Sequence, residues 1–168
     1  MDTDILFKEK QKFRQWWMWL ILLSVNIFFL YGIYRQVVMG KTFGDNPMSN
    51  AALIIVTVLT FGITLLFQAF RLETIIKKDG IYVRFFPFHL RYNHYAWHDL
   101  TRCFVRKYSP LREYGGWGIR IGLGGKGKAY NVSGNQGLQL EFTTGKRLLI
   151  GTNKPDEVTT TLEQINEL

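Results

Sequence analysis

Two long apolar runs near the amino terminus dominate the hydropathy pattern of the chain. No charged residue occurs from Trp16 to Tyr34, and none occurs from Asn46 to Phe70. A helix of about 20 apolar residues is enough to cross the ~30 Å hydrocarbon core of a bilayer. The pattern therefore predicts a transmembrane helical hairpin over residues 16–70, with spans at about 16–36 and 48–70.

A cleaved signal peptide and a buried core helix are the alternatives for the first run. Basic residues precede this run, as they do in a signal peptide. However, the run is long, and the bulky stretch Tyr31–Arg35 offers no small-residue cleavage site. A second apolar run follows closely, so two retained spans are the favoured interpretation.

Basic residues near the ends of the two runs predict the orientation of the chain. The stretch between the runs is poor in them, with only Arg35 and Lys41 against Asp45. The outer flanks are rich in them: Lys8, Lys10, Lys12, Arg14, Arg71, Lys77, Lys78 and Arg84. An excess of Lys and Arg marks the cytoplasmic side of a membrane. We therefore expect a multi-pass protein of the cell inner (plasma) membrane with both termini cytoplasmic, including a cytoplasmic amino-terminal segment over residues 1–15.

After Arg71 the pattern changes to short alternating segments separated by turn residues. This pattern predicts strands at 72–78, 81–86, 91–97, 102–108, 117–121, 138–142 and 146–150. Pro155 and the acidic residues after it are typical of a helix start, and apolar positions then recur at helical spacing. We expect residues 71–168 to form a cytoplasmic α+β domain, in which a small barrel or sandwich of about seven strands is followed by a carboxy-terminal helix.

The segments Arg112–Arg120 (REYGGWGIR) and Gly127–Glu157 carry a family resemblance. They resemble the bacterial membrane-anchored pleckstrin-homology-like (bacterial PH) proteins, in which one or two amino-terminal hairpins precede the domain. The resemblance implies a pleckstrin-homology-like fold for residues 71–168. It implies no fixed activity, because one fold can carry many functions.

Three local features invite a catalytic or metal-binding interpretation, and each has a simpler one. Gly122–Lys128 has the glycine and lysine spacing of a phosphate-binding loop, but Ala129 follows where Ser or Thr is needed, and a strand-like segment follows where a helix is needed. His94 and His98 lie about 13 Å apart on a strand, too far to share one ion. Cys103 has no nearby base in the sequence and is expected to be a sheet residue. We predict no catalytic residue, cofactor or metal.

The stretch Tyr114, Gly115, Gly116, Trp117 and Gly118 is the most distinctive local motif. Its glycines suggest positive φ angles or a close backbone approach. The favoured interpretation is a bend that places Trp117 in the core. The alternative is an exposed aromatic loop that contacts a partner or the bilayer interface.

The distribution of charge points to a contact with an anionic surface. The chain carries a net charge of +8, and residues 71–128 hold 12 Lys and Arg against 4 Asp and Glu. Each basic residue close to an anionic inner leaflet contributes about 1 kcal/mol of attraction. Nucleic acid is a poorer partner, because no recognition motif accompanies the charge. The candidate contact residues for lipid or a protein partner are Arg84, Arg91, Arg102, Arg106, Lys107, Arg112, Arg120, Lys126 and Lys128.

These observations favour a non-enzymatic, membrane-anchored module. It would act as an interaction or oligomerisation platform at the inner leaflet, with anionic phospholipid headgroups, a membrane protein or a second copy of the chain as partner. The alternatives are an accessory or assembly subunit of a membrane complex such as a transporter, and an enzyme with a site that the sequence does not reveal.

Overall fold

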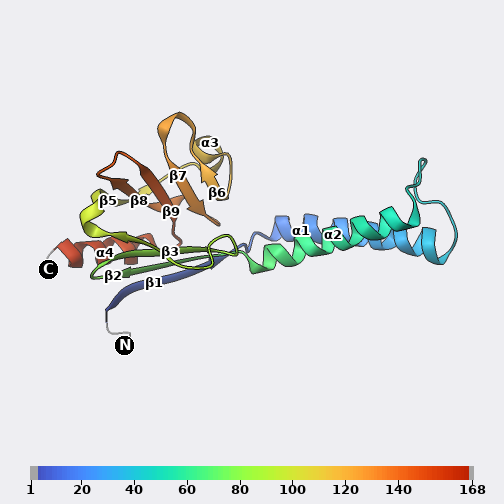
Figure 1. Ribbon diagram of the computed structural model, residues 1–168, viewed down its shortest axis with the longest axis horizontal. Coiled ribbons are helices and arrows are strands. Elements are labelled where there is room, and N and C mark those ends of the chain that lie inside the picture. The colour runs from blue at the N-terminus through green and yellow to red at the C-terminus, as the bar shows by residue number, and fades with distance from the viewer. Residues whose placement is uncertain (1–3, 167–168) are drawn as a thin grey trace. The chain divides into compact units, whose positions relative to one another are not determined.

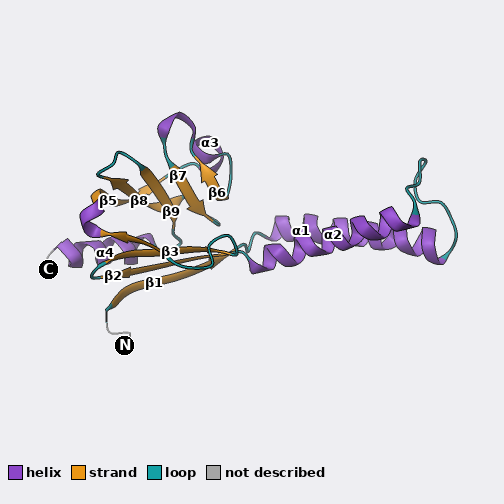
Figure 2. Ribbon diagram, viewed as in Figure 1, coloured by secondary structure: helices purple, strands orange, loops and turns teal. Residues whose placement is uncertain are grey.

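The chain folds as two compact units, which the computed structural model describes over residues 4–166 (Figure 1). One unit is the helical hairpin of residues 14–69. The other combines the residues before Arg14 with those from Phe70 onward, and we call it the sheet domain. Together they form a mixed α+β protein with four α-helices and two β-sheets among the described residues (Figure 2).

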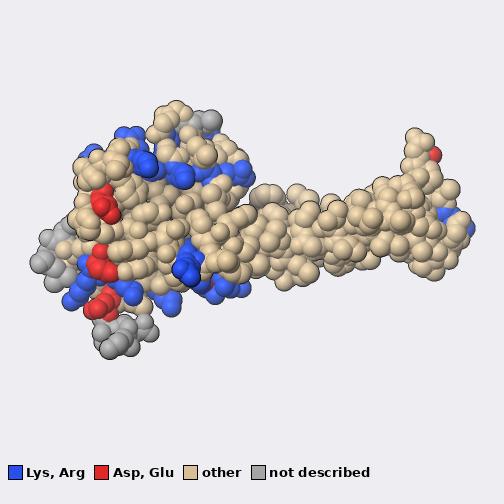
Figure 3. Space-filling view, viewed as in Figure 1, with Lys and Arg blue, Asp and Glu red and all other residues tan. Residues whose placement is uncertain are grey.

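The helical hairpin consists of two apolar helices. Helix α1 (Trp16–Ile33) continues into the π-helical segment η1 (Tyr34–Val38), and α2 (Asn50–Ala69) follows after a loop. Both helices are long and apolar enough to span a membrane, and the face drawn in Figure 3 shows no charged atom along most of their length. The side-chain amide of Asn26 donates a hydrogen bond to the Thr64 hydroxyl at 2.7 Å, so one polar contact joins the two helices.

The first sheet of the sheet domain is an antiparallel meander of four strands. It consists of β1 (Ile5–Lys12), β2 (Arg71–Lys77), β3 (Gly80–Phe86) and β4 (Asn93–Ala96) in that order. Strand β1 precedes the helical hairpin in the chain and β2 follows it, so the hairpin is the connection between two neighbouring strands. This arrangement differs from the predicted division of the chain, in which residues 1–15 were a separate segment.

The second sheet contains five strands in the order β5-β8-β9-β7-β6. They are β5 (Leu100–Lys107), β6 (Gly118–Ile121), β7 (Lys128–Asn131), β8 (Gln136–Phe142) and β9 (Arg147–Gly151). Only β7 and β9 run parallel. A short helix, α3 (Pro110–Tyr114), lies between β5 and β6 in the chain, and the short 3-10 segments η2 (Trp97–Asp99) and η3 (Leu123–Gly125) complete the connections.

The hydrophobic core of the domain lies between the two sheets. Phe85, Leu72 and Ile81 from the first sheet belong to the same buried cluster as Leu138 and Leu140 from the second. Helix α4 (Pro155–Asn166) packs against strands of both sheets and adds Val158, Leu162 and Ile165 to this cluster. The predicted carboxy-terminal helix is thus confirmed. The barrel alternative is wrong, because the nine described strands pair within two separate sheets and do not close on themselves.

Buried polar side chains tie β1 to the segment between β9 and α4. The Glu9 carboxylate accepts hydrogen bonds from the Thr152 hydroxyl at 2.6 Å and from the Asn153 backbone N–H at 2.9 Å. The Gln11 side-chain amide donates to the Gly151 carbonyl at 2.7 Å. Strand β1 therefore contributes to the first sheet and also connects it to the end of the second.

Candidate functional site

The outer face of the four-stranded sheet carries a cluster of basic side chains. Cross-strand pairing fixes it, because residues directly opposite one another share a face of the sheet. Lys12 lies opposite Arg71, and Lys10 lies opposite Glu73, which in turn lies opposite Arg84. We call this surface the basic face, and it comprises Lys8, Lys10, Lys12, Arg71, Lys77 and Arg84.

A single carboxylate organises the centre of the basic face. Glu73 forms ion pairs with Lys10 at 3.6 Å, with Arg71 at 3.3 Å and with Arg84, and it accepts a hydrogen bond from the Tyr92 hydroxyl at 2.7 Å. Burial alone would raise the pKa of Glu73, but the hydrogen bonds from Tyr92 and Arg84 outweigh it and leave that pKa lowered. Three cations around one anion leave this cluster with a net positive charge.

Replacing Glu73 with Gln should lower the free energy of unfolding at neutral pH. In acid the variant and the native chain should differ less. The folded-state pKa of Glu73 lies below its ordinary value of 4.5, so its contribution is fully present above that pH. The contribution is lost as the pH falls through the lowered folded value. Denaturant unfolding at pH 7 should show a loss of about 1–2 kcal/mol that shrinks towards pH 3. Glu157→Gln, which alters an exposed pair with Lys154, is the matched control and should change little. A pH-independent difference for Glu73→Gln would contradict the prediction.

The four-stranded sheet has one end at which the chain connects to the helical hairpin. An apolar loop lies at that end. Phe86, the last residue of β3, pairs with Arg71, and only Phe70 separates Arg71 from the end of α2. The following loop, residues 87–92, exposes Phe88 by 62% and Leu90 by 73%. The Phe88 ring stacks on Phe70, the residue that links α2 to β2, at 5.5 Å between ring centroids. The loop is thus held against Phe70, the first residue of the sheet domain after α2.

The basic residues singled out from the sequence do not form one surface. Arg84 lies on the basic face, whereas Arg106 is on β5 of the other sheet and forms an ion pair with Glu113 at 3.0 Å. Lys126 also pairs with Glu113, at 3.2 Å. In Figure 3, Lys and Arg side chains accordingly appear on both the upper and the lower borders of the sheet domain. The remaining candidates are exposed and spread over a loop, helix α3 and three strands: Arg91, Arg102, Lys107, Arg112, Arg120 and Lys128.

The glycine-rich motif that follows α3 has a structural role. Gly115 ends α3 with a φ of +68°, and its N–H donates to the Leu111 carbonyl, as is usual at a helix carboxyl end. Tyr114 is the buried aromatic residue of this motif. Trp117 is only half-buried and lies outside the main core, so the prediction that it fills the core is wrong. Its indole N–H donates to the Gly134 carbonyl at 3.3 Å.

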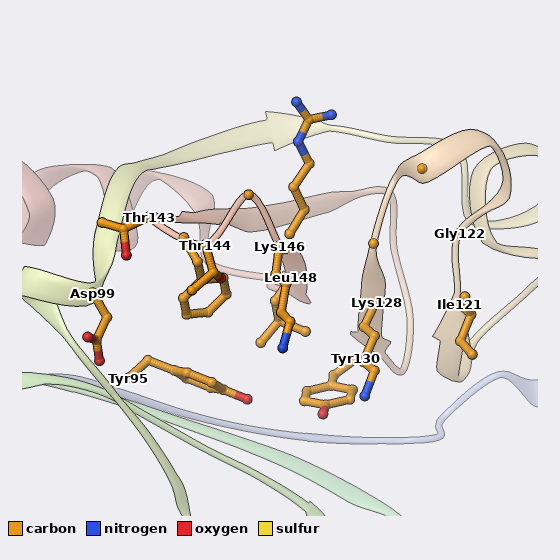
Figure 4. Close-up of a pocket in the computed structure, with 15 residues that line it drawn as sticks. Tyr95, Asp99, Ile121, Gly122, Lys128, Tyr130, Thr143, Thr144, Lys146 and Leu148 are labelled. Atoms are coloured by element: carbon orange, nitrogen blue, oxygen red, sulfur yellow. The ribbon is translucent and has the colours of Figure 1, made fainter.

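A cavity in the sheet domain has a volume of about 800 Å³ (Figure 4). Tyr95 on β4 and Tyr130 on β7 contribute aromatic walls, and Phe142 and Leu148 of the β8–β9 hairpin contribute apolar ones. Burial, together with a hydrogen bond to Tyr130, raises the pKa of the Tyr95 hydroxyl. The glycine-rich stretch after Ile121 forms another wall, a role that its sequence did not reveal.

The glycine-rich stretch, the histidines and Cys103, which resembled catalytic or metal sites in the sequence, make structural contacts in the fold. The glycine-rich stretch closes with a hydrogen bond from Gly122 N–H to the Gly127 carbonyl, and Lys128 then begins strand β7 in place of a helix. His94 stacks on Tyr82 at 4.4 Å. Within residues 4–166 no three His, Cys, Asp or Glu side chains gather as a metal site would require. Cys103 packs against the main core, and burial raises the pKa of its thiol to about 12.

The fold defines a class of protein in which a two-sheet α+β domain is interrupted, between its first two strands, by a hairpin of two apolar helices. A family model described as "Family of unknown function (DUF6141)" matches residues 1–165. The chain belongs to this family. A search of curated proteins gave no match.

Proposed function

We propose that this protein is a non-enzymatic, membrane-anchored module whose sheet domain docks onto the anionic inner leaflet of the cell membrane. The carrying observation is the composition of one end of the four-stranded sheet. That end joins both apolar helices through short connections, of which the one after α2 is the single residue Phe70. It also presents the exposed Phe88 and Leu90 and basic residues of the basic face.

These groups suit the two layers of a membrane surface. Transfer of a Phe or Leu side chain out of water is favourable, by about 1.5–3 kcal/mol each for complete burial. Each Lys or Arg near anionic headgroups contributes about 1 kcal/mol of electrostatic attraction. Lys12 and Arg71 lie at the sheet end where the chain connects to the helices, so their short links to the helices keep them close to any bilayer that the helices span.

The pleckstrin-homology-like character of the domain is part of the same proposal. A four-stranded meander, a second sheet containing β5, β8 and β9, and a closing helix α4 agree with the expected order of about seven strands and a helix. The segment with α3, β6 and β7 is then an insertion between β5 and β8. In this scheme the helical hairpin occupies the connection between the first two strands.

A spin label at Leu90 should test the docking of the loop. The full chain, carrying Cys103→Ala and Leu90→Cys, is labelled with a nitroxide and reconstituted into nanodiscs that contain anionic phospholipid. We expect the label at residue 90 to be relaxed by oxygen, which concentrates in the bilayer, and to be protected from a water-soluble nickel reagent. Replacing anionic with neutral lipid, or raising the salt concentration, should reduce this protection, because screening weakens surface attraction.

The matched control is Lys78→Cys in the same Cys103→Ala background. Lys78 is exposed in the turn between β2 and β3, at the opposite end of the same sheet. Its label should be freely accessible to the nickel reagent in every lipid. Equal accessibility at residues 78 and 90 in anionic nanodiscs would overturn the proposal that this end of the sheet docks.

A further inference from the structure

We infer that the cavity between β4, β7 and the β8–β9 hairpin is a binding site for an amphiphilic anion, a molecule with an apolar body and a terminal carboxylate or phosphate. This inference goes beyond the docking function and does not depend on it, because the cavity lies within the sheet domain. A volume of about 800 Å³ falls within the range of small-molecule sites, roughly 300–1,000 Å³.

The walls of the cavity select an apolar body. Tyr95 and Phe142 meet edge to face, with ring centroids 5.4 Å apart, and line the cavity together with the buried Leu148. The ring of Tyr130 is also buried, and its hydroxyl bonds to that of Tyr95. The Tyr95 hydroxyl donates this bond and the Tyr130 hydroxyl accepts it, so the two residues offer a ligand mainly the faces and edges of their aromatic rings.

The charges of the cavity select an anionic end. Figure 4 shows the ammonium groups of Lys128 and Lys146 directed towards the same space as the two tyrosine rings. Neither lysine forms an ion pair within the part of the chain that the structure describes, whereas Arg147 beside them is engaged by Glu141 at 3.4 Å. Among the described residues that line the cavity, Asp99 is the only acidic one, and it lies at the opposite end of the cavity from Lys128 (Figure 4).

The backbone frames this site rigidly on the side of Lys128. Gly127 has a φ of +80°, and a Cβ atom at this residue would lie 2.1 Å from the Arg147 carbonyl oxygen. Only glycine fits so close an approach, which places Lys128 beside the segment that carries Lys146. The backbone therefore fixes the starting points of both lysine side chains on one side of the cavity, and such preorganisation favours affinity for an anionic group.

The test is a calorimetric titration in which octyl phosphate is added to the full chain in neutral-lipid nanodiscs. The same titration into empty nanodiscs gives the baseline. We expect saturable binding with one site per chain. The double variant Lys128→Gln, Lys146→Gln should weaken binding at least about tenfold, since each charge-assisted hydrogen bond contributes strongly. Lys128→Arg with Lys146→Arg keeps both charges and should retain most of the affinity.

The control Lys107→Gln, Arg112→Gln removes the same charge from exposed positions outside the cavity and should bind octyl phosphate as the native chain does. Equal losses in the two double variants would overturn the assignment of the site. Octanol binding as tightly as octyl phosphate would overturn the anionic end, and inorganic phosphate binding as tightly would overturn the apolar body.

The same assay separates two sources of such a ligand. If anionic phospholipid in the nanodisc competes with octyl phosphate in the native chain and fails to do so in the Lys128→Gln, Lys146→Gln variant, the natural ligand comes from the membrane. If octyl phosphate binds equally well in anionic and neutral nanodiscs, the site serves a water-soluble amphiphile. Both outcomes support the assigned chemistry, whereas the absence of saturable octyl phosphate binding in both lipids would overturn it.

Discussion

Replacing residues 14–69 with a short glycine-rich turn should yield a folded, soluble sheet domain, whereas residues 70–168 alone should fail to fold cooperatively. Lys12 and Arg71 are directly paired neighbours in an antiparallel ladder, so a tight turn can join β1 to β2 as it does in ordinary hairpins. Without β1, the domain loses the buried Phe7 and exposes the ladder edge of β2. It also loses the partners of the segment after β9.

Circular dichroism and urea unfolding of the two proteins provide the measurement. The joined protein should unfold in one cooperative transition, as small single domains usually do. The protein lacking β1 should show a broad or absent transition. Adding a peptide of residues 1–13 should restore part of the structure, because the missing strand then pairs again. A cooperative transition of similar midpoint in both proteins would contradict the assigned role of β1.

Replacing Glu9 with Leu should destabilise the domain by about 2–3 kcal/mol, the second-largest effect we expect. The substitution removes the acceptor for the Thr152 hydroxyl and for the Asn153 N–H. A buried donor that loses its acceptor costs its full desolvation free energy, and this exceeds the gain from a new apolar side chain. Urea unfolding of the joined, soluble protein gives the value directly.

Lys8→Leu on the same strand is the control for Glu9→Leu. Lys8 is exposed on the outer face, so its replacement should change the free energy of unfolding by less than about 0.5 kcal/mol. The double variant Glu9→Leu, Thr152→Val should recover part of the loss, because both polar partners are then removed. A Glu9→Leu protein as stable as the native one would show that these bonds contribute nothing net.

Helices α1, α2 and α4 and most strands follow from sequence patterns, but β1 does not. Its inward positions are Phe7, Glu9 and Gln11, so only one of them is apolar. The alternation that identifies a half-buried strand is therefore hidden, and its outward lysines resemble the basic flank of a membrane span. The inward Glu9 and Gln11 gain their role only when the segment after β9 arrives from the far end of the chain.

Helix α3 was also absent from the predictions, for a different reason. It spans only Pro110–Tyr114, too short to show an apolar period. Its signals are local: Ser109 accepts a hydrogen bond from the Arg112 N–H, and Glu113 accepts one from the Ser109 N–H. A serine followed by proline and a nearby glutamate is a recognisable helix start. The capping residues of this helix could therefore have predicted it from the sequence.

The candidate surfaces depend on the pairing register of the strands, which cannot be predicted from composition. Basic residues were visible in the sequence, but which of them share a face follows from pairings such as Lys10 with Glu73. Arg106 and Lys126 converge on Glu113 because α3 and the glycine-rich stretch fold over the second sheet. The cavity likewise joins β4 to the β8–β9 hairpin, segments about 50 residues apart, and no local pattern marks it.

The insertion of the helical hairpin between β1 and β2 has a consequence for biogenesis. During synthesis β1 emerges first and must wait, without its partner strand, until both helices have been made and β2 has left the ribosome. In the membrane-anchored arrangement that we propose, the sheet can then close only if β1 and β2 are on the same side of the bilayer. A chain that inserts one helix alone leaves them on opposite sides and exposes an unpaired strand, which is a ready substrate for quality-control proteases. Under the proposed membrane anchoring, completion of the sheet would thus require that both helices have been inserted.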